Sequence, residues 1–452
     1  MAPSTPIDIV SRTWTRELAP TAPMPPSAEV VIIGGGIVGI ATAWFLAKQG
    51  ASVVVCEKGH IAGEQSGRNW GWVRQQGRDP REMPMIVESL RIWRQLGEEI
   101  GEDVGFRQHG ILYLIDDDAK AERYAAWARF AADFETGTRL IERNEMGHHV
   151  RGAATDWRGA LYTPTDGRAE PHKAAPALAR AVVRLGGNVL TGCAVRGVET
   201  TGGRISAVVT EYGTIQTSTV LCAAGAWTSM FCRSLGIRVP QLRVRGTVAR
   251  TGPAEAVCEG AMSDRNLALR RRLDGGYTVA SGSIIDHPVT PSTFRFGAQF
   301  ARALMNDARS MRLSLGHEFF DELATPRMWP LDAESPFEKC RVLDPEPNRK
   351  VLRNIRKRLD RTFPRLASVP IVESWAGMIE TTPDVVPIID EAAQLPGFYI
   401  ATGFSGHGFG IGPGAGKAIA GLITGHDVGL PVREFRLSRF SDGSRVGPRQ
   451  PA

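Results

Sequence analysis

The stretch from Val30 to Gly59 constrains the fold more than any other part of the chain. It opens with a β-branched apolar run over Val30 to Ile33, the pattern of a buried strand. The letters GGGIVG follow at 34–39, and helix-forming residues continue from Ile37 to Gln49. A second apolar run over Ser52 to Cys56 ends on Glu57. Strand, glycine turn, helix and second strand with a terminal acid predict a dinucleotide-binding unit.

Each polar or glycine position in this unit has a physical reason. Gly34 allows a tight turn, and Gly36 lets the backbone approach a pyrophosphate at the helix N-terminus. Gly39 lets the helix pack closely on the strand, and Glu57 can accept a hydrogen bond from a ribose hydroxyl. An acid here, rather than an arginine cluster, argues against a 2′-phosphate. The stretch by itself leaves both FAD and NAD open.

Chain length, hydropathy, cysteine spacing and net charge limit the classes of protein to which the chain can belong. The chain has 452 residues, more than the roughly 250–300 at which single cores stop growing, so two domains are expected. No window approaches the roughly 20 apolar residues needed to cross a bilayer, and a signal peptide's basic start and apolar core are missing. The six cysteines have no C-x-x-C spacing, and Cys56 and Cys222, which lie in apolar runs, are expected to be buried free thiols; this pattern fits a reducing cytoplasm. The net charge of +6 forms no block, which argues against nucleic-acid binding.

Two segments beside the first unit have distinct character. Residues 1–27 contain six prolines and no helical periodicity, so we expect a surface extension or partial disorder, with Trp14 docking somewhere. The polar loop from His60 to Met85 carries arginines and two tryptophans, and its place after the second strand predicts contact with the ligand. We expect a helix over 85–96, a strand over 111–115 and a helix over 119–134.

The middle of the chain predicts further helices and strands. We expect a helix over 171–185, a strand from Asn188, and an antiparallel meander built from the runs at 205–210, 214–216 and 219–222. A small-residue turn, AAGAW at 223–227, then lets the backbone pass close to something bulky. From Val239 to about Pro364, short strands at 242–251 and 277–281 alternate with a helix around 296–312, which predicts a second domain.

The end of the chain returns to nucleotide-domain character. A strand over 398–401 leads into a glycine-rich loop at 403–416, and a helix is expected over 417–423. A glycine loop at each end of the chain suits a long cofactor that is held at both of its ends. FAD fits this arrangement, because the first helix can bind its pyrophosphate. The last helix dipole, which we place after Gly416, would stabilise negative charge on the reduced ring.

These residues resemble the D-amino-acid oxidase superfamily of FAD enzymes, in its sarcosine oxidase, glycine oxidase and amino-acid dehydrogenase branch. The resemblance covers roughly Ala28 to Gly425. It rests on GGGIVG at 34–39 with Glu57, CAAGAW at 222–227, WAGMIETTPD at 375–384 and ATGFSGHGFGIGPG at 401–414. It implies hydride transfer from an amine-bearing carbon to flavin N5, followed by hydrolysis of the imine.

The resemblance also implies a fold class that combines α/β and α+β parts. A discontinuous Rossmann-type FAD-binding domain holds an inserted substrate domain built on a mixed or antiparallel sheet. We assign residues 28–85, 151–238 and 365–430 to the FAD-binding domain. The substrate domain takes 86–150 and 239–364, between an N-terminal extension at 1–27 and a C-terminal tail at 431–452.

The cofactor contacts implied by the resemblance come from three segments. The first segment contributes Gly34, Gly36, Ile37, Val38, Gly39, Glu57, Lys58, Ser66, Arg68, Asn69 and Trp70. The middle segment contributes Val195, Ala224, Gly225 and Trp227. The last segment contributes Gly377, Gly403, Gly406, His407, Gly408, Phe409 and Gly410.

Departures from the family pattern limit what carries over. Relatives with covalent flavin have a cysteine where this chain has Gly377, so FAD is expected to be non-covalent. The carboxylate-binding arginine of glycine oxidases is replaced by Ile379, and the corresponding lysine of sarcosine oxidases by Gly410. A gap-free comparison puts Ala280 at the position of the oxygen-promoting lysine, which favours a dehydrogenase.

The expected substrate contacts are therefore arginines elsewhere. Arg74 resembles the flavin-loop arginine of sarcosine oxidases, and a planar guanidinium suits a carboxylate. Either Arg74 touches substrate or flavin, or it forms an ordinary ion pair. The alternatives in the substrate domain are Arg245, Arg270, Arg272 and Tyr277. The pair His148-His149 has no metal-ligand spacing, and no metal site is expected.

Three functions stay open. The first is oxidation of the C–N bond of an amino acid or N-substituted amino acid, with electrons passed to a quinone, an electron-transfer protein or oxygen. The second is oxidation of a 2-hydroxy acid, since fold does not set chemistry. The third is a flavoprotein subunit of a multi-chain dehydrogenase, with the proline-rich start and the arginine-bearing tail as docking surfaces. We expect a cytoplasmic protein, with peripheral contact at the inner membrane and oligomerisation both open.

Overall fold

The computed structural model describes residues 24–282, 285–307 and 311–449, and Trp14 lies outside these ranges. Its first layer is a six-stranded sheet that is parallel except for one edge strand, β20. The strand order is β20 (Ile388–Glu391), β21 (Phe398–Thr402), β12 (Val220–Cys222), β1 (Val30–Ile33), β2 (Val53–Cys56) and β8 (Asn188–Leu190). Three of these strands, β1, β2 and β12, are buried at every residue, as expected for short β-branched runs between helices.

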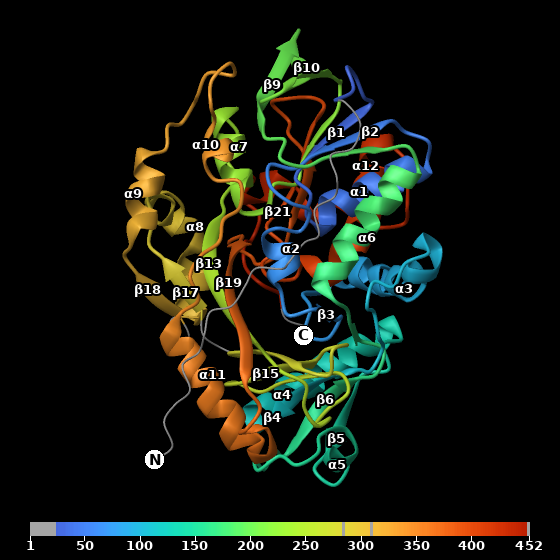
Figure 1. Ribbon diagram of the computed structural model, residues 1–452, viewed down its shortest axis with the longest axis vertical. Helices are drawn as coiled ribbons and strands as arrows, with labels where there is room; N and C mark the ends of the chain where they lie inside the picture. The colour runs from blue at the N-terminus through green and yellow to red at the C-terminus, as the bar shows by residue number, and fades with distance from the viewer. Residues whose placement is uncertain (1–23, 283–284, 308–310, 450–452) are drawn as a thin grey trace.

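Four helices pack against one another beside this sheet, in the upper right of Figure 1. They are α1 (Ile37–Lys48), α3 (Met83–Ile100), α6 (Pro171–Arg184) and α12 (Gly408–Thr424). Helix α12 approaches α1 very closely, because a Cβ at Gly416 would lie 2.6 Å from the Cβ of Ala41. It also touches α3, where a Cβ at Gly414 would lie 2.3 Å from the Met85 carbonyl oxygen.

This packing corrects two expectations from the sequence. The last helix begins at Gly408 and not at Lys417, because Gly412, Gly414 and Gly416 are the small residues that let α12 pack against its neighbours. The run at 219–222 does not extend the antiparallel meander. It forms β12, which pairs in parallel with β1 and β21, since its apolar residues are buried on both faces.

The meander itself has three strands, β9 (Val195–Thr201), β10 (Arg204–Thr210) and β11 (Gly213–Gln216), and all of its pairs are antiparallel. Several short elements complete this part of the fold. They are α2 (Gln65–Arg68), the pair β3 (Trp72–Val73) and β7 (Gly167–Arg168), α7 (Thr228–Ser234) and α10 (Pro336–Lys339).

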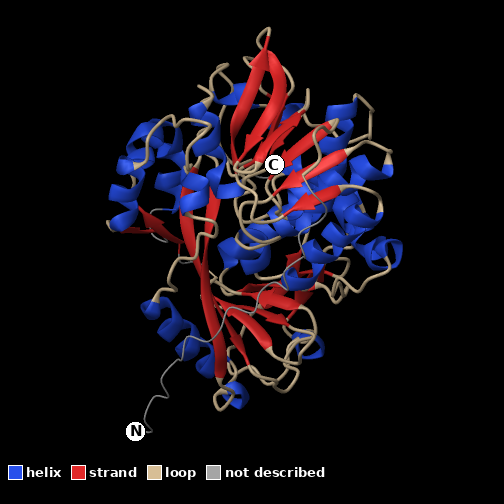
Figure 2. Ribbon diagram, turned by 45° about the horizontal axis from the view of Figure 1, so that its top comes forward, coloured by secondary structure: helices blue, strands red, loops and turns tan. Residues whose placement is uncertain are grey.

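The second large layer is a ten-stranded mixed sheet. Its order is β18 (Met311–Ser314), β17 (Ile285–Pro288), β13 (Leu242–Thr251), β16 (Tyr277–Ala280), β15 (Ala268–Arg271), β14 (Ala261–Ser263), β4 (Ile111–Ile115), β6 (Gly159–Thr163) and β5 (Arg139–Glu142). The tenth strand, β19 (Ile371–Thr381), pairs with β13 along its whole length, and the two run side by side through the centre of Figure 1. Figure 2 shows these long strands extending between the upper and lower parts of the protein.

Helices accompany this sheet on its outer sides. They are α4 (Asp118–Ala131), α5 (Met146–His149), α8 (Pro291–Asp307), α9 (His317–Ala324) and α11 (Arg349–Thr362). Helix α11 contributes Leu352, Ile355 and Leu359 to the hydrophobic core beneath the sheet. Two layered units of this kind confirm the combined α/β and α+β fold class.

The domain ranges stay a prediction, but strand pairing differs from them in two places. Strand β6 lies in the range 151–238 and β19 lies in 365–430, which we assign to the FAD-binding domain. Both nevertheless pair within the ten-stranded sheet. Helix α3 behaves in the opposite way, because residues after 85 pack on α12 rather than on the substrate sheet.

A buried ion-pair cluster ties the C-terminal tail to the rest of the protein. Asp384 accepts hydrogen bonds from Arg81 at 2.8 Å and from Arg439 at 3.0 Å, and all three side chains are almost completely buried. The tail arginine Arg439 is therefore part of the structural core and does not form a docking surface. None of the helices within the described ranges is long and apolar enough to span a membrane.

Candidate active site

A cavity of about 1020 Å³ lies where the parallel strands end. Residues just after β1, β2, β12 and β21 line one side, and β13 and β19 of the other sheet line the opposite side. Ligands of open α/β sheets bind at the carboxyl ends of the strands. The cavity therefore joins the two layers at the position that the sequence predicts for the cofactor.

The structure brings the proposed cofactor residues together around this cavity. All of them line it except Gly39 and Gly403. A Cβ at Gly39 would lie 2.2 Å from the Gly34 carbonyl oxygen, so this glycine is needed for packing of α1 on the turn. Gly403 has a φ of +74°, and a Cβ there would lie 2.2 Å from Cγ2 of Thr382. Both glycines shape the walls without reaching the cavity.

The first glycine turn is shaped to receive an anion and a sugar. The Glu57 carboxylate accepts hydrogen bonds from the backbone N–H groups of Gly35 and Gly59, each at 2.7 Å. Burial raises the pKa of Glu57, and these two backbone donors oppose the rise. The Ser66 hydroxyl accepts a hydrogen bond from the Ile37 N–H at 2.9 Å, at the first residue of α1.

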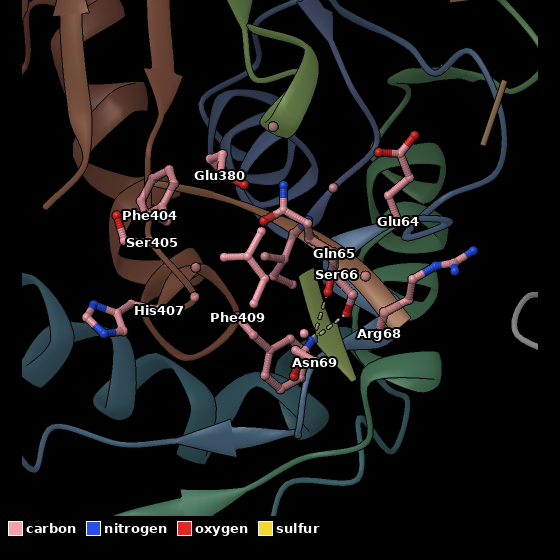
Figure 3. Close-up of a pocket in the computed structure, with 18 of the residues that line it drawn as sticks. Glu64, Gln65, Ser66, Arg68, Asn69, Glu380, Phe404, Ser405, His407 and Phe409 are labelled. Carbon is pink, nitrogen blue, oxygen red and sulfur yellow. Dashed lines mark hydrogen bonds between the residues drawn. The ribbon is translucent and has the colours of Figure 1, made fainter. Parts of the chain in front are cut away.

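Two basic residues predicted to contact the cofactor are held largely by other groups. Lys58 Nζ donates to the carbonyl oxygens of Cys340 and Arg341 at 2.8 and 2.9 Å, and to Glu64. Arg68 pairs with Asp344 and donates to the Ala376 carbonyl oxygen. In Figure 3, Arg68 points away from the group formed by Gln65 and Glu380. Asn69 instead orders the loop, donating to the Ser66 carbonyl oxygen at 2.7 Å.

Of the residues expected to contact the substrate, Arg74 lines the cavity. Its guanidinium lies 5.5 Å from the centre of the Tyr113 ring and donates to the Gln76 carbonyl oxygen. Phe409 and Gly410, at the start of α12, line the same end. A Cβ at Gly410 would lie 3.2 Å from the Val73 Cα, which places this helix start directly against the strand before Arg74.

The four alternatives do not line the cavity. Arg270 and Arg272 both face the buried Glu170, with Arg270 donating to it at 3.0 Å, so they form a structural ion-pair cluster. Tyr277 is fully buried, and its hydroxyl donates to the Glu255 carbonyl oxygen. Arg245 lies 3.8 Å from Asp286. None of these four residues therefore belongs to the proposed substrate site.

His407 lies at the start of α12, beside a buried acid. Its Nδ1 is 3.4 Å from Glu82 Oε2, and Glu82 is completely buried. Burial, together with the nearby Arg78 guanidinium, lowers the pKa of His407 to about 4. The imidazole is therefore neutral near pH 7 and can donate or accept one hydrogen bond without adding charge.

Several charged residues of the cavity wall were not predicted from the sequence, and two of them, Arg78 and Glu380, are almost completely buried. Arg78 follows Arg74 by four positions in the same loop, so its signal was present in the letters RQQGR. Glu380 precedes the T-T-P-D motif on β19, where alternation would place one neighbour in the sheet core. Its side chain is 4% exposed, and Oε2 has no hydrogen-bond partner within the described part of the chain. Figure 3 shows it facing Gln65.

Glu380 gives a testable pH dependence. Burial raises its pKa to about 7, and the Glu64 carboxylate adds to the rise. The folded state therefore keeps a proton that an unfolded glutamate releases near pH ~4.3. The stability that this proton contributes is complete below the unfolded pKa of Glu380. It is lost as the pH rises through the folded pKa of about 7, by on the order of 3 kcal/mol. A Glu380→Gln variant lacks this loss, so its thermal unfolding midpoint relative to wild type should rise between pH 5 and pH 8. An equal difference at both pH values would contradict this assignment.

Comparison with known proteins gives the family. A family model described as FAD dependent oxidoreductase (DAO) matches residues 29–422. The chain belongs to this family. The predicted resemblance to the D-amino-acid oxidase superfamily is confirmed, and with it an FAD-dependent oxidoreductase.

Several relatives match nearly the whole chain. The structure of L-amino acid deaminase from Proteus myxofaciens, in complex with anthranilate, is 33% identical with a TM-score of 0.92, covering 96% of this chain and 98% of that one. Mitochondrial sarcosine dehydrogenase of Mus musculus is 26% identical over 93% of this chain, which spans only 42% of that longer protein. Sarcosine oxidase subunit beta of an Arthrobacter species is 24% identical, with 93% of both chains covered.

The residues of this chain fit FAD. Gly36 has a φ of −73°, which any residue can adopt, so the backbone conformation does not require glycine here. What glycine provides is the empty space beside its Cα. That space belongs to the cavity, directly at the N-terminus of α1. Glu57 lies at the end of β2, and the start of α12 faces the same cavity. When FAD is bound, these groups would hold its pyrophosphate, its ribose and a ring with negative charge.

Proposed function

We propose that this protein is an FAD-dependent enzyme that oxidises the C–N bond of an amino acid or N-substituted amino acid. The observation that carries the proposal is the convergence of both glycine segments and Arg74 on one cavity. The cavity thus combines a cradle for FAD with a cation suited to a carboxylate. The likeness to L-amino acid deaminase and to sarcosine dehydrogenase supports the same class of substrate.

When bound, FAD supplies the acceptor for the hydride that leaves the amine-bearing carbon. The residues of this chain bind and orient the substrate. Arg74 holds the carboxylate, so that the carbon to be oxidised has one fixed position in the cavity. The neutral imidazole of His407 leaves the substrate amine free of a competing charge at the start of α12. Phe409 and Tyr113 cover this end with apolar surface.

An anaerobic substrate screen tests the proposal. Purified protein is mixed with sets of L- and D-amino acids, N-methyl amino acids and matched 2-hydroxy acids, while the absorbance of oxidised flavin is followed. We expect bleaching by members of the amino-acid sets, and none by their 2-hydroxy counterparts. Bleaching by hydroxy acids alone would replace the proposal with the 2-hydroxy acid alternative.

We further propose that FAD is held non-covalently and that electrons pass to an acceptor other than oxygen. Gly377 lines the cavity where covalent relatives carry a cysteine, and Ala280 is buried in β16 without a basic group at its position. Acid precipitation should release all of the flavin into the supernatant. With the true substrate, reduction of a dye should be faster than formation of hydrogen peroxide, and the reverse order would show an oxidase.

A role as one subunit of a larger assembly has a specific observation in its favour. The chain covers 93% of a sarcosine oxidase subunit beta, whose own name describes a multi-subunit enzyme. Light scattering of the purified chain, with and without the products of neighbouring genes, would distinguish an independent enzyme from a subunit. A chain that bleaches with substrate only after a partner is added would support the assembly.

A further inference from the structure

Arg78 is a buried cation in the cavity wall that the proposed function has not yet used. It lies between β3 and the short helix Pro80–Glu82, and 3% of its surface is exposed. Its Nε donates to the Arg74 carbonyl oxygen at 3.1 Å, while its Nη1 is buried and has no hydrogen-bond partner among the residues described. Leaving a buried charged donor unpaired is costly, so such a group indicates a missing partner.

A second guanidinium lies beside it. Arg74 and Arg78 line the same cavity, and the charge of Arg74 raises the cost of keeping Arg78 charged. Burial first, and then Arg74, lowers the pKa of Arg78 to about 10. Two like charges in a buried wall are stabilised most directly by an anion that touches both.

Two acids of this chain lie near Arg78, and neither pairs with it. Asp166 faces both arginines, but its carboxylate accepts the backbone N–H groups of Gln75 and Gln76 at 2.8 and 3.2 Å. Glu82 interacts with the charge of Arg78, but its Oε2 faces His407 Nδ1 at 3.4 Å, and neither of its oxygens has a hydrogen-bond partner in the described chain. Neither acid forms an ion pair with Arg78 within the 4.0 Å limit of such contacts in the described chain. The unpaired Nη1 is therefore left for a ligand.

The position of Arg78 separates this ligand from the cofactor phosphates. The pyrophosphate site is at Gly34 to Gly39, at the start of α1. Arg78 instead lies with His407, whose pKa it lowers, at the start of α12. This end also holds Ile379 and Gly410, the positions where relatives carry the carboxylate anchors that this chain lacks.

We propose that Arg78 is a second carboxylate-binding residue, which together with Arg74 clamps the substrate's carboxylate group. The inference rests on the proposed function, since it takes the substrate to be an amino acid. It replaces the missing family anchors with an arginine pair from a single loop. Each guanidinium presents a planar fork of N–H donors to the carboxylate, a geometry that lysine cannot reproduce.

Ligand binding to the FAD-loaded protein tests this without turnover. The probes are anthranilate, which is bound in the deaminase structure, and its neutral amide 2-aminobenzamide, each titrated while the flavin spectrum is followed. We expect Arg78→Gln to raise the dissociation constant of anthranilate by at least about tenfold. The amide should bind wild type and variant alike, and the FAD content per chain should stay at the wild-type level.

Two further variants keep the test decisive. Arg78→Lys keeps the buried charge and so protects folding, yet it should still weaken anthranilate severalfold because the fork is lost. Arg91→Gln makes the same charge change on an exposed side chain of α3, and it should bind both probes as wild type does.

Several outcomes would overturn the proposal. They are unchanged anthranilate binding in both Arg78 variants, an equal loss for the acid and the amide, a lowered FAD content, or a wild type that does not prefer the acid. The proposed function fails separately, if no amino acid bleaches the flavin in the anaerobic screen.

Discussion

A Gly36→Val variant is expected to fold normally but to purify with little or no FAD. The backbone at Gly36 has φ −73° and ψ 171°, which valine adopts without strain. A Cβ there meets one atom within 4 Å, the Ser66 hydroxyl oxygen at 3.2 Å, and the rest of the side chain would enter the cavity. That is the space through which the backbone must approach the pyrophosphate. Affinity for FAD should fall by at least about 100-fold, which corresponds to about 3 kcal/mol.

Gly147→Val is the matched control, because Gly147 lies in the exposed helix α5 and a Cβ there meets nothing within 4 Å. It should bind FAD as wild type does. Absorbance at the flavin bands, set against protein concentration, measures the FAD content, and far-ultraviolet circular dichroism checks the fold. If the Gly36→Val protein contains as much FAD as wild type, the cofactor does not bind in the part of the cavity at the start of α1.

Replacing Asp384 by alanine should produce the largest loss of stability among single substitutions outside the cofactor site. Asp384 is the shared anion for two buried guanidiniums, Arg81 and Arg439. Its removal leaves the buried Arg439 without its charged partner, while Arg81 keeps its ion pair with Asp79. Breaking a buried pair in this way costs about 3–5 kcal/mol. The loss should appear as a lowered midpoint in thermal or denaturant unfolding, together with easier proteolysis of the tail after residue 430.

Asp442→Ala provides the comparison, since Asp442 pairs with Arg436 on side chains that are about one-third exposed. An exposed pair of this kind contributes less than about 1 kcal/mol. If Asp384→Ala and Asp442→Ala shift the unfolding midpoint equally, the Asp384 cluster does not anchor the tail.

The sequence predicted the first nucleotide-binding unit closely, because its signals are local. A β-branched run of four residues, a glycine pattern and an acid at a fixed distance predict β1, α1 and β2 to within one residue of their observed bounds. The observed strand and helix starts at Val30 and Ile37 coincide with the predicted ones. Hydrophobic periodicity is a pattern over a few neighbouring residues, so it predicts elements whose structure depends mainly on such local patterns.

Pairings between distant segments could not be read in the same way. The partner of β19 is β13, more than a hundred residues earlier, and neither strand carries a mark of the other. Arg270 was an expected substrate contact in the sequence. Its partner Glu170 comes from the start of α6, so the ion pair became visible only in the folded chain.

The dependence on distant segments also explains why the burial of Glu380 and Arg78 in the cavity wall was not predicted. The burial of Glu380 depends on β19 facing the segment that carries Gln65, and the burial of Arg78 depends on contact with the start of α12. Sequence resemblance indicates that Ile379 and Gly410 stand where relatives carry carboxylate anchors, and this stays a prediction. It could not show which other cation the fold would place near them.

A single-turnover experiment under anaerobic conditions tests C–N bond oxidation most directly. Protein loaded with FAD is mixed with one equivalent of the amino acid that bleaches it fastest, and the products are quantified after quenching. The account predicts one equivalent of 2-oxo acid or aldehyde, together with one equivalent of ammonia or amine, for each flavin reduced. Flavin reduction without release of ammonia or an amine would contradict it.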